Sequence, residues 1–347
     1  MAMKKVRNYQ NMNHIVKRIG ILTGVFAAAL CVFFLANNRW NSGQDQAVYM
    51  DMEAASLPSI TVQMLGRDMN RLYGYRQEMN TTAAGENLTI LPEDRALTVD
   101  ITGGGVTGIS YEVRSMDRAR LVERTEVSDW QQTQQGIAAT LSIQNLLTKE
   151  REYQLIIQLD TENYGSVYYY TRILWTDSAQ HARDMVDLAA DFSIKTFDYE
   201  QAKSLTTYLE TSPSEDNSTF GHTSIHSSFS QLTWGKMNMQ PEGNVEIRLK
   251  ELDGVMCGVQ LSYQAKRQGD GAEETYEVEE DFTLKWNELR IYMMQYDRTV
   301  NQIFAGDRSE YSGKRILLGI TQDDRVELVK SAGGKSLAYR VNRDLWS

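Results

Sequence analysis

Histidine is the side chain most often used to bind metals and to move protons near neutral pH. It occurs only four times in 347 residues. His222 and His226 are four apart, which would place both imidazoles on one face of a helix. They lie, however, within 211–228, where Ser, Thr and Gly indicate a loop. Neither a nearby cysteine nor the glutamate of a zinc-protease motif accompanies them, so we predict no metal site.

Other patterns that could carry chemistry are incomplete. Residues 334–336 (Gly-Lys-Ser) copy the end of a phosphate-binding loop, but Val329 stands where the first glycine is required. A glycosidase needs two carboxylates facing each other across a sugar. The adjacent acids are expected in loops or on outward strand positions: 273–274, 279–281 and 323–324. We therefore predict no catalytic residue and no cofactor.

Aromatic side chains are the stronger candidates for ligand contact. Tyr168, Tyr169 and Tyr170 are consecutive, and because side chains alternate along a strand, Tyr169 must point away from its neighbours. One face of this strand therefore shows rings to solvent or to another element. Trp234 and Trp286 offer a similar surface. Exposed rings can stack on sugars or anchor a protein partner, so these five residues are our predicted binding surface. The alternative is that they fill a core and a domain interface.

The segments that must position these rings are mainly strands. Within 57–175, short stretches of alternating apolar and polar residues recur with turn residues between them, as in a β-sandwich. Residues 109–114 (ISYEVR) alternate strictly. Residues 152–159 (EYQLIIQL) and 166–174 (SVYYYTRIL) follow with a glycine-containing turn between them.

A local motif sharpens this prediction. Leu147 and Tyr153 stand six apart, immediately before an alternating strand. This arrangement resembles the tyrosine corner of fibronectin type III domains, in which the tyrosine hydroxyl ties back to the preceding loop. The resemblance covers 57–175 and implies a fibronectin type III or immunoglobulin-like sandwich there. Val99 and Ile101 stand where such domains usually bury a tryptophan.

Beyond the sandwich we expect a two-helix connector over 176–211. Asp198, followed by Gln201, resembles a capping box at the start of the second helix. A second β-rich domain is predicted over 212–306, with a hairpin at 253–254 (Asp-Gly). The expected fold is therefore mainly β, with tandem β-sandwich domains joined by the two-helix connector. Residues 307–347 form a short meander. Because the chain stops on an apolar strand start, we expect truncation or a partner at that edge.

The N-terminal region predicts a membrane anchor. Arg18 and Arg39 bracket twenty uncharged positions, and about 20 apolar residues are needed to span a bilayer as a helix. The basic, acid-free tail 1–18 favours a cytoplasmic N-terminus, and Trp40 suits the interface. The apolar run is long for a cleaved signal peptide. We expect an uncleaved signal anchor over 19–38, a linker over 39–56, and an extracytoplasmic body in contact with the bilayer only through the anchor.

Composition limits the partners. The net charge is −10, although the tail is basic, so the body is acidic and nucleic acid is an unsuitable ligand. The two cysteines, Cys31 and Cys257, lie in the predicted span and far outside it, so no disulfide framework is expected. The whole chain resembles single-span envelope proteins of Gram-positive anaerobes, which implies a location at the plasma membrane but no activity.

These features predict a non-catalytic envelope protein whose extracytoplasmic domains scaffold or bind another envelope component, either a protein or a glycan. One alternative is an extracytoplasmic sensor that acts through its span on a membrane partner, since the tail is too short to be an output domain. A wall-active hydrolase is the least favoured reading, because no catalytic motif accompanies the acidic pairs.

Overall fold

The computed structural model describes residues 20–33, 57–79, 85–134, 136–145, 147–268 and 273–304, with short stretches at 311–312, 315–316, 319–320, 328–333, 336–341 and 344–346. The chain divides into two units, Met1–Ala55 and Ser56–Ser347, and each is described by itself. The predicted tail, the linker 39–56 and the predicted anchor residues Arg18, Arg39 and Trp40 lie outside the described residues.

In the first unit, residues 20–33 form a helix in which every side chain is exposed, including Ile21, Leu22 and Phe26. A search of the described part of the chain finds no helix that combines the length and the apolar character needed to cross a membrane.

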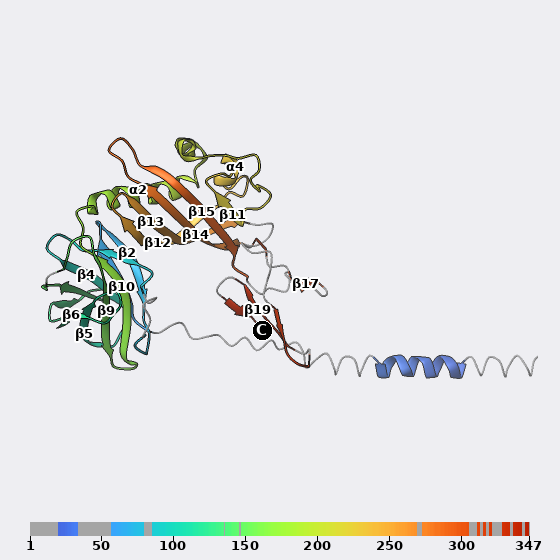
Figure 1. Cartoon of the computed structure of the whole chain (residues 1–347). Coiled ribbons are helices and arrows are strands. Elements are labelled where there is room, and N and C mark those ends of the chain that lie inside the picture. The colour runs from blue at the N-terminus through green and yellow to red at the C-terminus, as the bar shows by residue number, and fades with distance from the viewer. Residues whose placement is uncertain are drawn as a thin grey trace, which may run out of the picture. The chain divides into compact units, whose positions relative to one another are not determined.

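The second unit begins with two five-stranded sheets that pack as a sandwich (Figure 1). The first sheet has the order β2-β1-β4-β8-β7 and the second β3-β10-β9-β5-β6. Only β3 and β10 pair in parallel; all the other described pairs are antiparallel. The bounds are β1 (Ser59–Met64), β2 (Arg67–Tyr73), β3 (Leu88–Ile90), β4 (Ala96–Thr102), β5 (Val106–Arg114), β6 (Leu121–Glu126), β7 (Trp130–Gln132), β8 (Ile137–Ser142), β9 (Glu152–Thr161) and β10 (Gly165–Leu174).

Alternation explains which side chains enter this sandwich. In β5, Ile109, Tyr111 and Val113 are buried, whereas the residues between them point to the outer face. The predicted tyrosine tie is present, since the Thr148 amide donates to the Tyr153 hydroxyl at 3.1 Å. That bond fixes the loop that leads into β9.

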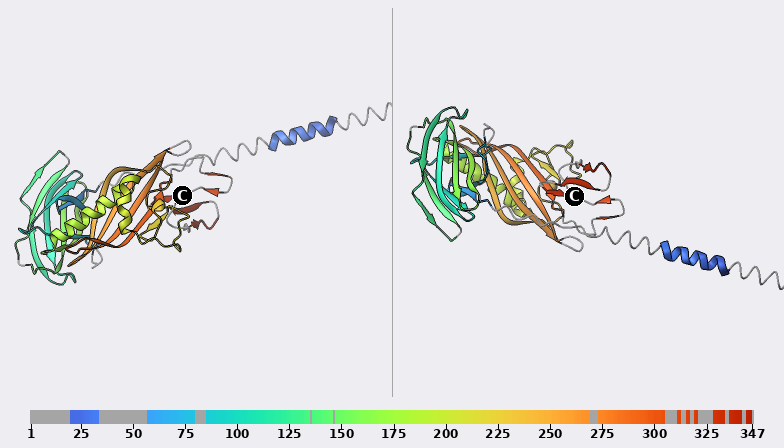
Figure 2. Two further views of the ribbon diagram at one scale, coloured as in Figure 1. Left: turned by 90° about the horizontal axis from the view of Figure 1, so that it is seen from above. Right: turned by 90° about the horizontal axis from the view of Figure 1, so that it is seen from below.

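Helices follow the sandwich, within the expected region. They are α2 (Ala179–Lys195), α3 (Tyr199–Ala202) and a 3-10 turn, η1 (Lys203–Tyr208). Asp198 caps α3 as predicted: its side chain accepts from the amides of Glu200 and Gln201 at 2.9 and 3.1 Å. Helix α2 lies along one face of a third sheet, as the two views of Figure 2 show.

The third sheet has the order β11-β15-β14-β13-β12 and is antiparallel. Its strands are β11 (His222–Ser224), β12 (Gln240–Asp253), β13 (Met256–Gln268), β14 (Glu273–Lys285) and β15 (Tyr292–Gln302), and the short helix α4 (Phe229–Leu232) precedes β12. Short strands β16 (Tyr311–Ser312), β17 (Arg315–Ile316), β18 (Leu328–Lys330), β19 (Leu337–Val341) and β20 (Asp344–Trp346) end the described chain.

The second β-rich region is therefore not the second sandwich that we predicted. Among the described residues it is one sheet whose inner face, with Leu261 and Phe282, packs against α2. The outer face of the same strands carries Gln260, Glu279 and Asp281. Because only one face of this sheet is apolar, one packed layer is enough to bury it, and α2 forms that layer. Moreover, one hydrophobic cluster includes residues of all three sheets and of α2, so the sandwich and the third sheet share a core.

Candidate functional site

The outer face of the second sheet carries a groove of about 290 Å³, which we call the sheet-face groove. It lies over β5, β6, β9 and β10, whose outward residues are mostly polar because the inward ones fill the sandwich. Its lining residues are Glu78, Ser110, Tyr111, Glu112, Arg124, Glu126, Ile156, Gln158 and Tyr168. Aromatic and aliphatic groups are thus surrounded by carboxylate, amide, hydroxyl and guanidinium groups.

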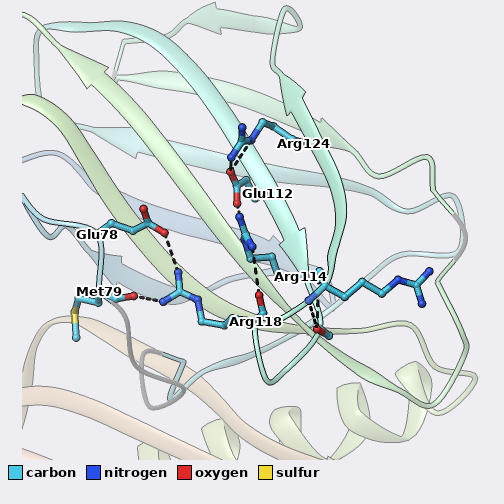
Figure 3. A network of polar contacts seen from close by, with 8 residues as sticks. Glu78, Met79, Glu112, Arg114, Arg118 and Arg124 are labelled. Carbon is cyan, nitrogen blue, oxygen red and sulfur yellow. Dashed lines mark hydrogen bonds and ion pairs between the residues drawn. The ribbon is translucent and has the colours of Figure 1, made fainter.

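Two arginines hold the central carboxylate of the groove. Arg114 Nε donates to Oε2 of Glu112 at 2.6 Å, and Arg124 Nε donates to Oε1 at 2.6 Å (Figure 3). Burial alone would raise the pKa of Glu112, but these bonds outweigh it and lower that pKa. Glu112 is therefore ionised near neutral pH, and both of its oxygens already accept hydrogen bonds.

A third arginine binds Glu78, which is one of the residues that line the groove. Arg118, at the β5–β6 turn, donates to Oε1 of Glu78 at 3.1 Å and to the Met79 carbonyl (Figure 3). Its guanidinium lies 5.7 Å from the centre of the Tyr170 ring. Arg118 thus fastens the segment that follows β2 across the second sheet.

The same crossing segment explains the tyrosine run. Tyr75 exchanges two backbone hydrogen bonds with Tyr168, each 2.9 Å, and its ring contacts Tyr170 edge to face. Tyr170 is only 6% exposed, and its hydroxyl accepts from the Met79 amide at 2.7 Å. The outer face of β10 is therefore covered at Tyr170 and remains half-open at Tyr168.

The predicted aromatic surface is wrong for three of its five members. Tyr169 is fully buried in the sandwich, where its hydroxyl donates to the Pro58 carbonyl at 2.6 Å. Tyr170 is covered as described, and Trp234 is buried against Arg298 and Phe197. The alternative of core and interface therefore holds for these three residues.

The other two predicted members are half-exposed but far apart in the fold. Tyr168 lines the sheet-face groove. Trp286 follows β14 and stacks on His181 of α2, with ring centres 3.7 Å apart. They do not form one surface, and only Tyr168 lies among polar groups suited to a ligand.

No protein-family model matches this chain, and no curated protein matches it. The site therefore rests on its own geometry. Among the described residues no group of His, Cys, Asp and Glu is arranged to hold a metal ion. His222 instead lies 3.2 Å from Asp297, and His226 Nδ1 lies 2.9 Å from the Glu210 carbonyl.

Sequence reasoning missed the charged members of the groove. The strict alternation of 109–114 already placed Glu112 and Arg114 on one face. Their partner Arg124 could be found only from the pairing of β5 with β6, where Glu112 stands opposite Arg124. The signal in the sequence was that oppositely charged residues can face each other on paired strands, but it could be used only once the pairing of β5 with β6 was known.

Glu123 of β6 is buried beneath the groove and connects β6 by hydrogen bonds to the interior of the sandwich. This carboxylate is 6% exposed and accepts from the Asn145 amide at 2.9 Å and the Gln144 amide at 3.1 Å. The Tyr111 hydroxyl donates to it at 2.8 Å. Burial alone would raise the pKa of Glu123, but these bonds together lower it.

We expect Glu123→Gln to reduce the free energy of unfolding by about 1–2 kcal/mol at pH 7, because a neutral amide accepts these bonds less strongly. A lowered folded-state pKa contributes stability above the unfolded pKa, and that contribution disappears as pH falls through the folded value. The difference from the wild type should therefore be smaller at pH 3 than at pH 7, as measured by urea unfolding at the two pH values. An equal difference at both pH values would contradict the role given to the charge.

Proposed function

We propose that this protein is a non-catalytic, membrane-anchored envelope protein whose sheet-face groove binds a hydroxyl-rich envelope component, a glycan. The observation that carries the proposal is the combination in one groove of a half-exposed ring, Tyr168, with carboxylates, an amide and a guanidinium. Such planar polar groups hydrogen-bond to neighbouring hydroxyls, while the ring covers the apolar face of a sugar.

Binding suits this groove better than hydrolysis. A glycosidase acid must be protonated near neutral pH, which requires a raised pKa. Glu112 has the opposite shift and is held by two arginines. The carboxyl groups with raised pKa, Glu280 and Asp281, lie on β14 of the third sheet and not in the groove.

The anchor belongs to the same proposal. We infer that 19–38 holds the chain in the plasma membrane, with the N-terminus in the cytoplasm and the second unit outside. An exposed helix that is apolar all round, as residues 20–33 are, is unfavourable in water and favourable in lipid. The flanking basic residues of the sequence support the orientation.

We also infer that the first two sheets form an immunoglobulin-like or fibronectin type III-like sandwich. The neighbours β1-β4-β8-β7 and β5-β9-β10 follow the A-B-E-D and C-F-G orders of such domains. The Tyr153–Thr148 hydrogen bond adds the expected corner.

The test is a glycan pull-down with the full chain in lipid nanodiscs, using purified cell-wall polysaccharide and peptidoglycan fragments. Tyr168→Ala is expected to weaken binding about tenfold, which corresponds to one ring-to-sugar contact of about 1.4 kcal/mol. Tyr292→Ala, which removes a partly exposed tyrosine from the third sheet, is the matched control and should bind like the wild type. Equal binding by both variants would refute the groove as the site, and turnover of the glycan would refute the non-catalytic role. Co-purification of a membrane protein without any glycan binding would favour the sensor alternative instead.

A further inference from the structure

A second cavity, of about 400 Å³, lies where the C-terminal half of α2 meets β12, β13 and the β1–β2 hairpin. We call it the joint cavity. Its walls are mostly aliphatic and aromatic, with Ile194, Phe197, Val245, Ile247 and Leu261 as the main members. Ile194 and Val245 are 52% and 39% exposed, so the cavity leaves apolar surface open to solvent.

The floor of the joint cavity is also apolar on the side that a ligand would meet. Tyr263 lines it but is only 5% exposed, and its hydroxyl is buried beside Ser193 and Glu280. Burial, with the nearby Glu280 carboxyl, raises the pKa of Tyr263 well above its usual value, so the hydroxyl is neutral. Because that hydroxyl is turned into the protein, the tyrosine offers its ring to the cavity.

The mouth of the cavity carries an aspartate that has no ion-pair partner among the described residues. Arg67 and Asp68 both lie there, on β2. Arg67 is engaged by Asp187 of α2, with Nε to Oδ1 at 2.8 Å and a second nitrogen at 2.7 Å. Asp68 is exposed and takes part in no ion pair within the described residues. Arg183 shares a neighbouring cavity with Asp68 but does not line this one. With Arg67 neutralised, Asp68 is therefore the charge that the lining of the joint cavity leaves for a ligand, and it favours a cation.

We propose that the joint cavity binds a cationic amphiphile, with its apolar tail against Leu261 and Tyr263 and its positive group beside Asp68. A tail in this position covers the exposed faces of Ile194 and Val245. An anionic head would instead be repelled by Asp68, while the nearby Arg67 is already paired with Asp187, on a protein whose net charge is −10. This site is separate from the sheet-face groove and does not depend on its function.

The experiment uses an octylammonium probe with a diazirine near its methyl end, added to the full chain in nanodiscs, followed by irradiation and mass-spectrometric mapping. The label is expected on peptides that contain Ile194 and Leu261. Ala190→Phe fills the cavity from α2 and should reduce this labelling at least tenfold. Ala119→Phe, at an exposed turn outside the cavity, is the matched control and should leave it unchanged.

Competition identifies the head group. Unlabelled octylammonium should compete about five- to tenfold better than octanoate, and Asp68→Asn should remove most of that preference. Asp129→Asn, at another exposed carboxylate, should retain it. Labelling of Ile194 and Leu261 that persists in Ala190→Phe would overturn the site. Octanoate that competes as well as octylammonium would overturn the ligand class.

Discussion

Replacing Arg298 with methionine is expected to reduce the free energy of unfolding by about 3–5 kcal/mol, the largest single-residue effect that we predict. This arginine is fully buried in the third sheet. It donates to the carbonyls of Leu232 and Gln231 at 3.0 and 2.9 Å, and its guanidinium lies 3.6 Å from the centre of the Trp234 ring. Methionine would fill much of the volume but leave the Leu232 carbonyl unpaired. It would also remove one of the bonds to the Gln231 carbonyl, which still accepts from the Trp234 amide at 3.3 Å.

The loss has an electrostatic component as well. Glu280 stands opposite Arg298 in the β14–β15 register and is also fully buried. Burial raises the pKa of Glu280, and the charge of Arg298 opposes that rise. A raised folded-state pKa means that stability is lost as pH rises through it. Without the arginine the pKa of Glu280 rises further, so the loss of stability should continue to higher pH in Arg298→Met than in the wild type.

Urea unfolding in nanodiscs, followed by tryptophan fluorescence at several pH values, measures both effects. The control is Arg124→Met, which removes an arginine whose side chain is 64% exposed and should cost less than about 1 kcal/mol. A cost for Arg298→Met as small as that of the control would contradict the role assigned to the buried pair.

The local elements of this fold could be predicted from the sequence because they depend on neighbouring residues. Alternation predicted most of the longer strands, and Asp198 predicted the start of α3. The β1–β2 turn is also a local feature, since Leu65 and Gly66 both have the positive φ that a tight hairpin turn requires.

The aromatic surface could not be predicted from the sequence. The alternation of side chains along a strand assigns residues to two faces, but it does not show which other elements pack on each face. Tyr169 and Tyr170 point to opposite faces, and both are buried: one by the sandwich, the other by the segment after β2. That covering segment is about 90 residues earlier in the chain, since Met79 contacts Tyr170 across a separation of 91 residues. The groove depends on the same long-range pairing, so its charged residues were recognised only in the fold.

The joint between the sandwich and the third sheet provides the second large prediction. Asn70 of β2 is fully buried, and its Nδ2 donates to the Leu88 carbonyl at 2.8 Å. Its Oδ1 accepts from the Leu249 amide of β12 at 2.9 Å, 179 residues later in the chain. One side-chain amide therefore satisfies a backbone group in the sandwich and another in the third sheet.

Asn70→Ala is expected to cost about 3 kcal/mol or more in free energy of unfolding. Two buried backbone groups lose their partners, at about 1–3 kcal/mol each. The residue also has a φ of 50°, a left-handed conformation that asparagine tolerates better than alanine. Urea unfolding of the full chain in nanodiscs measures the total.

Two further variants separate the causes. Asn70→Gly relieves the backbone conformation but restores neither hydrogen bond, so it should recover only about 1 kcal/mol of the loss. Asn238 has a similar φ of 51° but is exposed, so Asn238→Ala should cost only the conformational part, about 1 kcal/mol. If Asn70→Gly restored wild-type stability, the hydrogen bonds would be dispensable and the sheets would be held by the shared hydrophobic core alone. If the loss persists, Asn70 joins the two sheets directly, beside the Arg71–Glu246 ion pair between β2 and β12. It then helps to set the geometry of the joint cavity, whose walls come from both sides of that joint.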